Sequence, residues 1–255
     1  MNYPKSHNLL SGKTVVVTAA AGTGIGFATA KRCVEEGADI LISDHHEKRL
    51  AQAAQSLTEL GLGKVYSQVC DVTQENQVQN LVSAAEVAFE GIDIWVNNAG
   101  LGGSARVAEM SDEAWSRTLD VTLTGTLRCL RAALNHMQPR GCGTIINNAS
   151  VLGWRAQKEQ AHYAAAKAGV MALTRCAALE AAEYGLRINA VAPSLAMHPF
   201  LAKVTSDELL AELAAKEAFG RPAEVWEVAN VIVFLASDLS SYMTGETISV
   251  SSQRA

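Results

Sequence analysis

The sequence predicts an α/β fold in which helices cover both faces of a doubly wound parallel sheet of about seven strands. Short apolar runs alternate with longer stretches rich in Ala, Glu, Gln and Leu, which is the pattern of repeated βαβ units. The apolar runs are nearly continuous in Val and Ile, as is typical of strands buried on both faces. With 49% hydrophobic and 18% charged residues, the composition favours a packed globular structure.

Each expected strand is a short apolar run that ends beside small or polar residues. The runs lie at residues 14–18, 39–43, 92–96, 144–147, 187–191 and 247–250, and a further strand precedes Cys70. A helical stretch at residues 27–36 follows the first run. The chain has five prolines and no Ser/Gly linker or charge block, so residues 1–255 are expected to form a single domain.

Charge and cysteine content exclude several classes of function. The net charge of −5, from 21 basic and 26 acidic residues, provides no broad cationic surface, so nucleic acid is not expected as a partner. The five cysteines are odd in number and lack the spacing of a zinc site, so we expect reduced thiols and no metal. No apolar run can cross a bilayer and residues 1–10 contain no apolar signal segment, which predicts a cytoplasmic protein without a membrane partner.

A glycine-rich turn follows the first expected strand. Residues 18–26 read TAAAGTGIG and open a helix. Glycines at such a turn let the backbone approach a pyrophosphate, which the helix N-terminus stabilises through its unpaired N–H groups and its dipole. The alternative is a tight turn that only packs the helix on the strand. The predicted cofactor contacts are Gly22, Thr23, Gly24, Ile25 and Gly26.

Asp44 ends the second expected strand, at the distance from the turn that dinucleotide sites show. A carboxylate there accepts hydrogen bonds from both ribose hydroxyls of an adenosine and repels a 2′-phosphate. No Arg or Lys occurs in the turn or directly after Asp44 to neutralise such a phosphate, although Lys48 and Arg49 follow one helical turn later. The pattern therefore favours NAD over NADP, with His45 as a neighbouring contact. The alternative is that Asp44 merely caps the next helix.

Two further strand ends carry small polar residues that face the same crevice. Asp71 and Val72 follow the third strand, where Asp71 can accept a hydrogen bond from an adenine amino group. Asn98, Ala99 and Gly100 follow the fourth strand and give a cofactor access to the backbone. Turn chemistry alone is the alternative explanation, because Asn, Asp and Gly are common in turns.

The most specific pattern combines Ser150, Tyr163 and Lys167. Tyr163 and Lys167 are four residues apart and therefore share one face of an Ala-rich helix. A nearby ammonium favours phenolate, so we expect the pKa of Tyr163 to fall from about 10 towards neutrality. Such a phenol exchanges the proton in an alcohol/ketone interconversion, while Ser150 holds the substrate oxygen. The alternative is an exposed tyrosine and lysine without a chemical role.

Together these motifs resemble the short-chain dehydrogenase/reductase family over residues 10–250. The resemblance implies a Rossmann-like fold, a nicotinamide cofactor and catalytic roles for Ser150, Tyr163 and Lys167. It also implies that Lys167 binds the nicotinamide ribose.

The same resemblance extends to assembly and to the segment after the sixth strand. Family members usually form tetramers through two long helices, which here would begin near Glu113 and His162, so a homotetramer or dimer is expected. Cofactor contacts are implied for Pro193, Ser194 and Ala196.

Four departures from the family pattern stand out. The glycine-rich turn is one residue longer, with Ala20 in place of the first glycine. Thr122 replaces the asparagine that holds a water in the proton relay, so either its hydroxyl orders that water or the relay is absent. Ser194 replaces a glycine, and His198 stands where a threonine usually contacts the carboxamide. Residues 251–253 replace the closing Asp-Gly-Gly.

The phrases TAAAGTGIG, SDHHEKRL, NNASVLGWRAQ and EAFGRPAEVWEVA resemble a subgroup of this family in actinobacterial steroid catabolism. That resemblance implies NAD-linked oxidation of a hydroxyl on a hydrophobic alicyclic CoA thioester derived from steroid rings C and D. One alternative is a 3-oxoacyl thioester reductase of fatty-acid metabolism. Another is a non-catalytic, cofactor-binding regulatory or scaffold protein.

The substrate pocket is expected between the loops that follow the fourth and fifth strands and residues 195–219. Trp154 can pack on an alicyclic ring, and Arg155 can meet a carboxylate, carbonyl or phosphate, unless both lie on the surface outside the pocket. A helical pattern within residues 200–220 follows a Pro-containing loop and predicts a lid, the alternative being an ordinary surface helix. The predicted substrate contacts are Gly102, Trp154, Arg155 and His198.

Overall fold

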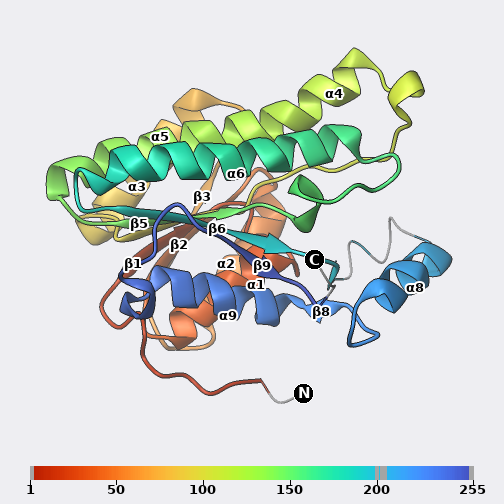
Figure 1. The fold of residues 1–255 in the computed structure, drawn as a ribbon. Coiled ribbons are helices and arrows are strands. Elements are labelled where there is room, and N and C mark those ends of the chain that lie inside the picture. Colours follow the sequence, from red (N-terminus) through yellow and green to blue (C-terminus); the bar gives the residue numbers. More distant parts are fainter. Residues whose placement is uncertain (1–2, 199–200, 202–205, 253–255) are drawn as a thin grey trace.

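The computed structural model describes residues 3–198, 201 and 206–252 of the chain. Its central sheet contains seven parallel strands in the order β3-β2-β1-β4-β5-β6-β9 (Figure 1). This confirms the predicted doubly wound sheet, whose strand order reverses between β1 and β4. The strands are β1 (Thr14–Val17), β2 (Asp39–Asp44), β3 (Val65–Val69), β4 (Ile94–Asn97), β5 (Thr144–Asn148), β6 (Arg187–Pro193) and β9 (Thr247–Val250). A second, two-stranded parallel sheet pairs β7 (Ala196–Met197) with β8 (Ala223–Glu224).

Helices cover the sheet in two layers, one on each face (Figure 1). One layer is α1 (Ile25–Glu35), α2 (Glu47–Thr58) and α9 (Val225–Ala236), and the other is α3 (Glu75–Phe89), α5 (Gly125–Met137) and α6 (Ala161–Ala182). Val15 and Val17 of β1 pack in the core under the first layer, while Val16 packs in the core under the second. Burial on both faces explains why the strands read as continuous apolar runs.

The helix expected to begin near Glu113 is interrupted. It consists of α4 (Asp112–Leu119) and α5, joined by a five-residue π-helical segment, η2 (Asp120–Thr124). Thr122 lies at the centre of η2 and is fully buried. Periodicity did not predict this interruption, because a single-turn π-helix leaves the apolar pattern on either side intact, and such segments are frequent at functional sites.

The remaining helices are short. They are η1 (Val107–Glu109), η3 (Gln138–Arg140), η4 (Val151–Gly153), α8 (Asp207–Lys216) and η5 (Asp238–Ser240). Among the residues described, no helix combines the length and the apolarity needed to cross a bilayer.

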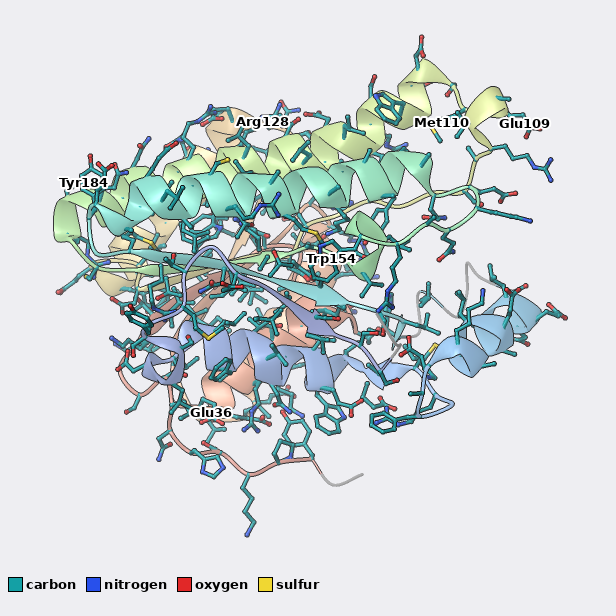
Figure 2. The ribbon with its side chains drawn as sticks, in the orientation of Figure 1. Glu36, Glu109, Met110, Arg128, Trp154 and Tyr184 are labelled. Carbon is teal, nitrogen blue, oxygen red and sulfur yellow. The ribbon has the colours of Figure 1, made fainter. Side chains whose placement is uncertain are left out.

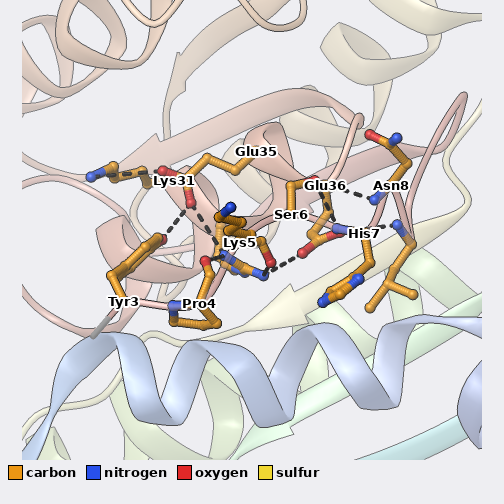
Figure 3. A network of polar contacts seen from close by, with 11 residues as sticks. Tyr3, Pro4, Lys5, Ser6, His7, Asn8, Lys31, Glu35 and Glu36 are labelled. Carbon is orange, nitrogen blue, oxygen red and sulfur yellow. Dashed lines mark hydrogen bonds and ion pairs between the residues drawn. The ribbon is translucent and has the colours of Figure 1, made fainter. Parts of the chain in front are cut away.

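The segment before β1 is held at the end of α1 by hydrogen bonds to a buried ion pair (Figure 3). Arg32 donates to the Pro4 carbonyl at 2.8 Å and pairs with Glu36. Glu36 also accepts the N–H groups of His7 at 2.9 Å and Leu9 at 3.0 Å. The end of α1 therefore fixes the chain just before it enters the sheet.

Candidate active site

The glycine-rich turn connects β1 to α1 at the carboxyl edge of the sheet. Ala19 has a left-handed backbone with φ +51°, and Gly22 has φ +106°. A Cβ atom at Gly26 would fall 2.4 Å from both the Ala19 carbonyl oxygen and Asn98 Nδ2, so only glycine fits there. Gly24 is the N-cap of α1 and has no side chain to cap the helix, so the first N–H groups of α1 can face a ligand.

Two residues of the turn differ in exposure. Thr23 is exposed, whereas Ile25 is half-buried and begins α1. Ala20, at the position of the family's first glycine, is buried and donates its N–H to the Ser43 carbonyl at 2.9 Å. This bond fixes the longer turn against the end of β2.

Asp44 lies beside the glycine-rich turn and is 6% exposed. Its carboxylate accepts the Ala21 N–H at 3.3 Å and the His46 N–H at 2.9 Å, and His45 Nδ1 lies 3.3 Å away. The residue that caps α2 is His46, which accepts the Arg49 N–H. The helix-cap explanation for Asp44 is therefore wrong, and the carboxylate is placed against the turn.

Asp71 and Val72, which follow β3, make contacts that stabilise the local structure. Asp71 accepts the N–H of Thr73 at 2.9 Å and its hydroxyl at 2.8 Å, which is the turn chemistry named as the alternative. Val72 packs against Gly125, where an added Cβ atom would lie 2.7 Å from Val72 Cγ2. The third strand end is thereby joined to the start of α5.

The loop after β4 lies next to Tyr163 and Lys167. The N–H groups of Asn98 and Ala99 donate to the Thr18 hydroxyl at 2.9 Å and 3.3 Å. A Cβ at Gly100 would lie 3.4 Å from Lys167 Nζ, and one at Gly102 would lie 3.8 Å from Tyr163 Cδ2. These contacts bring the fourth strand end, the glycine-rich turn and α6 together.

Ser150, Tyr163 and Lys167 converge at the end of β5. The Ser150 side chain accepts the Leu152 N–H at 3.2 Å and shares a hydrogen bond with Tyr163. Lys167 Nζ lies 5.6 Å from the centroid of the Tyr163 ring and donates to the Asn148 carbonyl. Ser150 and Lys167 are both buried, so the alternative of an exposed pair does not hold for this lysine.

Burial determines the protonation of Tyr163 and Lys167. It raises the pKa of Tyr163 to about 12, although the hydrogen bond with Ser150 acts in the opposite direction. It lowers the pKa of Lys167 to about 8. The expected fall in the pKa of Tyr163 is therefore wrong for this structure, because desolvation by burial dominates, and the Lys167 ammonium donates its hydrogen bond to the Asn148 carbonyl.

Thr122 holds the loop after β4. Its hydroxyl accepts the Leu101 N–H and donates to the Leu101 carbonyl. The Thr122 carbonyl accepts the Thr126 hydroxyl at 2.8 Å. The π-helical segment thus places Thr122 within reach of the loop that also contacts Lys167.

The segment after β6 brings two predicted cofactor contacts to the same edge. Pro193 is the last residue of β6, and Ser194 donates its N–H to the Val250 carbonyl at 3.1 Å. Ala196 pairs with Ala223 in the small sheet. In the part of the chain that the structure describes, Ser194 Oγ is buried and has no hydrogen-bond partner.

The loop after η4 carries the predicted substrate contacts. Trp154 is 53% exposed and lies beneath α6, toward α8 (Figure 2). Arg155 is half-buried and its N–H donates to the Val151 carbonyl at 2.9 Å. Glu159 joins this loop to the loop after β4 by accepting the Ser104 hydroxyl at 2.6 Å.

The predicted lid lies only in part within the described residues, because residues 199–200 and 202–205 lie outside them. His198 Nδ1 accepts the Leu201 N–H at 3.3 Å, and burial lowers the pKa of His198. Helix α8 stands apart from the two layers (Figure 1). Just after α8, Glu217 accepts the N–H and the hydroxyl of Ser252 at 3.1 Å and 2.8 Å. Ser252 is one of the residues that depart from the family pattern, and it anchors the end of this segment. Gln253, another of them, lies outside the residues that the structure describes.

The residues present fit a nicotinamide dinucleotide. A Cβ atom at Gly22 or Gly24 would meet nothing within 4 Å, so the turn is open there, and the Asp44 carboxylate lies beside it. Two buried polar atoms at the ends of β5 and β6, Asn148 Oδ1 and Ser194 Oγ, have no partner among the described residues, as expected of atoms that bind a polar ligand. No group of His, Cys, Asp and Glu residues in the described part of the chain is arranged to bind a metal ion.

Sequence reasoning missed Asn148, which contacts Lys167 through its carbonyl and Asn98 through its side chain. A signal was present in the sequence. The triplet Asn-Asn-Ala ends both the fourth and the fifth strand, at residues 97–99 and 147–149.

Comparison with known proteins relates the chain to oxidoreductases. The family model described as enoyl-(acyl carrier protein) reductase matches residues 19–252. A Mycobacterium tuberculosis protein named (5R,7aS)-5-hydroxy-7a-methyl-1-oxo-2,3,5,6,7,7a-hexahydro-1H-indene-carboxyl-CoA reductase is 64% identical over 249 residues, which are 97% of this chain and 95% of that protein. Cis-4-hydroxycyclohexanecarboxylate dehydrogenase of Sinomonas cyclohexanicum is 40% identical over 237 residues, 92% of this chain and 94% of that protein.

Solved structures show the same likeness. A short chain dehydrogenase from Mycobacterium smegmatis superposes with a TM-score of 0.90 and 55% identity, covering 100% of this chain and 98% of the other. NAD+-bound xylitol dehydrogenase superposes with a TM-score of 0.89 and 33% identity, covering 95% and 99%. The similarity therefore extends over nearly the whole chain.

Proposed function

The chain belongs to the short-chain dehydrogenase/reductase family of oxidoreductases, and on that basis we propose that it is an NAD-dependent secondary-alcohol dehydrogenase for alicyclic substrates. The observation that carries the proposal is the convergence of Ser150, Tyr163 and Lys167 at the edge of the sheet where Asp44 lies beside the glycine-rich turn. A small-molecule substrate and a nicotinamide cofactor follow from membership of the family.

NAD is proposed rather than NADP because of the charge beside the turn. Asp44 presents a buried carboxylate there, which would repel a 2′-phosphate. Lys48 and Arg49 are exposed residues of α2, after the His46 cap. Gly22, Thr23, Gly24, Ile25 and Gly26 would lie along the pyrophosphate.

The reaction proposed is the exchange of a secondary alcohol and a ketone. A nicotinamide cofactor held along the glycine-rich turn would supply the acceptor for the hydride that leaves the carbinol carbon. Tyr163 takes the hydroxyl proton as the carbonyl forms, and Ser150 hydrogen-bonds the same substrate oxygen. Burial raises the pKa of Tyr163 to about 12, so the phenol is protonated at neutral pH, and the hydrogen bond with Ser150 is the contact that favours its ionisation.

The substrate class is proposed from the relatives and from the pocket loops. The names of the two relatives above each describe an alicyclic ring with a hydroxyl and a carboxyl-derived group. Trp154 offers an exposed ring on the loop after η4, and Arg155 follows it. We therefore propose a hydrophobic, steroid-derived alicyclic alcohol whose carboxyl group is carried as a CoA thioester.

Initial rates test this function. Alicyclic hydroxy acids and their CoA thioesters should be compared as substrates, each with NAD and NADP. We expect turnover with NAD and a preference for the thioesters. Efficient reduction of linear 3-oxoacyl thioesters with NADPH would instead support the fatty-acid alternative, for which reductases at 35% and 36% identity are relatives.

We also propose an assembly and a location for the protein. Large apolar side chains are exposed on α4, α5 and α6, among them Trp115, Leu127 and Leu179, which supports a homotetramer or dimer through this layer. Light scattering of the purified protein would give the assembly size. The free cysteines of the described residues support a reducing, cytoplasmic location.

Residues 1–255 are proposed to form a single domain. Its substrate lid is proposed to lie within residues 195–219 and to include α8.

A further inference from the structure

Two asparagine ladders connect β4 to β5 on opposite faces of the sheet. The strand register sets Asn97 opposite Asn147. On the face covered by α6, Asn97 Nδ2 donates to Asn147 Oδ1 at 2.9 Å, and Asn147 Nδ2 donates to Thr174 Oγ1 at 2.9 Å. Because side chains alternate along a strand, the next pair, Asn98 and Asn148, points to the other face.

The second ladder runs from the glycine-rich turn to Lys167. Asn98 Nδ2 donates to the Ala19 carbonyl at 3.0 Å, and Asn148 Nδ2 donates to Asn98 Oδ1 at 2.9 Å. The Asn148 carbonyl then accepts the ammonium of Lys167. Three hydrogen bonds therefore join two parts of the site that are far apart in the sequence.

We propose that Asn148 is a positioning residue that fixes Lys167 relative to the glycine-rich turn. The inference rests on the proposed dehydrogenase function, because it assigns Asn148 a part in that site. Lys167 is 3% exposed, so its ammonium depends on the few acceptors within reach, and the Asn148 carbonyl is one of them.

Both sides of the Asn148 peptide are held, and by different means. On one side the Ala149 N–H donates to the Val191 carbonyl of β6 at 2.8 Å. The Asn148 carbonyl points the opposite way, because the two groups of a trans peptide are antiparallel. On that side the side-chain bond to Asn98 ties the residue to β4. Without the side-chain bond, only the Ala149 N–H bond would hold this peptide, and the Asn148 carbonyl could turn away from Lys167.

The Asn148→Leu variant tests this role, since it removes the amide and keeps the backbone carbonyl, the branching at Cγ and the number of heavy side-chain atoms. We expect NADH to bind about fivefold more weakly and kcat to fall about tenfold, as for the loss of one hydrogen bond to a buried charge, with the alcohol KM almost unchanged. The matched control is Thr174→Val, which removes the corresponding bond of the other ladder on the same strand and the same helix. It should lower the melting temperature and leave NADH affinity and kcat unchanged.

A double-mutant cycle with Lys167→Met, read by NADH fluorescence titration, separates positioning from a general structural role. If Asn148 acts through Lys167, Asn148→Leu will change the NADH Kd by less than about twofold in the Lys167→Met background. Equal losses in both backgrounds would overturn the inference, as would an Asn148→Leu protein that behaves like Thr174→Val. The cycle needs only cofactor binding, so a protein that binds NADH and oxidises none of the alcohols would contradict the proposed substrate class alone.

Circular dichroism and thermal unfolding check that each variant folds. Asn148→Ala provides a second variant that cannot be too large for the site, and it should give the same loss in NADH affinity. If both Asn148 variants fail to fold while Thr174→Val folds, Asn148 is a structural residue and the inference is wrong.

Discussion

The hydroxyl of Thr122 accepts the Leu101 N–H at 2.9 Å and donates to the Leu101 carbonyl at 3.1 Å. One side chain in the π-helical segment therefore satisfies both backbone groups of a residue in the loop after β4. That loop also carries Gly100 and Gly102, which approach Lys167 and Tyr163. Thr122 acts on the site by fixing this loop, whatever part it has in a proton relay.

Thr122→Val should lower stability and turnover together, because the Leu101 N–H and carbonyl lose their partner. The expected cost is about 1–3 kcal/mol in the free energy of unfolding. Thermal unfolding and steady-state rates measure the two effects. Thr122→Ser keeps the hydroxyl and is the control, and Thr122→Asn should keep turnover similar or raise it. A Thr122→Val enzyme with unaltered stability, turnover and pH–rate profile would show that neither the loop nor a relay depends on this hydroxyl.

Tyr163→Phe should lower turnover by at least about 100-fold, the usual scale for loss of a general acid or base. The phenol is the proton-exchanging group at the end of β5, and its hydrogen bond with Ser150 is lost. Circular dichroism and NADH titration should show an intact fold and retained cofactor binding. Near-normal turnover by the variant would remove Tyr163 from the proposed role.

Asp44→Ala should reverse or level the preference for NADH over NADPH. The carboxylate that would repel a 2′-phosphate is removed, and the Ala21 N–H that it accepted becomes available to a ligand. Fluorescence titration with both reduced cofactors, on the unaltered protein and the variant, gives the ratio of the two Kd values. Tighter binding of NADPH by the unaltered protein would contradict the choice of NAD.

Lys167→Met should change how stability depends on alkaline pH. Burial lowers the pKa of Lys167 to about 8 in the folded protein, whereas the unfolded chain keeps its proton to about 10.5. Between these values the unfolded state binds more protons, so the unaltered protein gains stability as pH rises, by at most about 3 kcal/mol. The variant has no buried ammonium, so it should be more stable than the unaltered protein near pH 7. Its stability should not rise between pH 8 and 10.5 as that of the unaltered protein does. Parallel stability curves for the two proteins across this window would refute the depressed pKa.

Glu36→Gln should destabilise the protein by about 3 kcal/mol at neutral pH, because the buried Arg32 loses its fully buried ion partner and keeps only the more distant carboxylate of Glu35, 3.7 Å away. Burial opposes ionisation of Glu36, but the Leu9 and His7 N–H groups and Arg32 outweigh it and hold its pKa below the usual value of 4.5. The stabilisation is therefore complete above pH 4.5 and is lost as pH falls through the lowered folded-state pKa. Chemical denaturation at neutral and acidic pH should show the two proteins converging in acid, whereas Glu35→Gln, a neighbouring but less buried acid, should change stability little.

Local sequence patterns predict the order of the strands along the chain, their burial on both faces, and the positions of the candidate cofactor-binding and catalytic residues. Strands buried on both faces require continuous apolar runs, so the runs near Val15 and Ile145 could be recognised without knowing their neighbours. The glycine-rich turn and the four-residue spacing of Tyr163 and Lys167 are equally local, since they depend on backbone geometry within one turn or one helix. Patterns of this kind are set by residues close together in the chain.

The contacts through which these parts act on one another depend on the folded arrangement of the chain. The π-helical turn at Thr122 pairs with a loop 21 residues earlier, and Asn148 pairs with a residue 50 positions earlier, so neither contact follows from periodicity. The raised pKa of Tyr163 likewise follows from desolvation by burial, which the four-residue spacing from Lys167 does not reveal. Hydrogen bonding and burial depend on what lies nearby in space, and those neighbours come from distant parts of the chain.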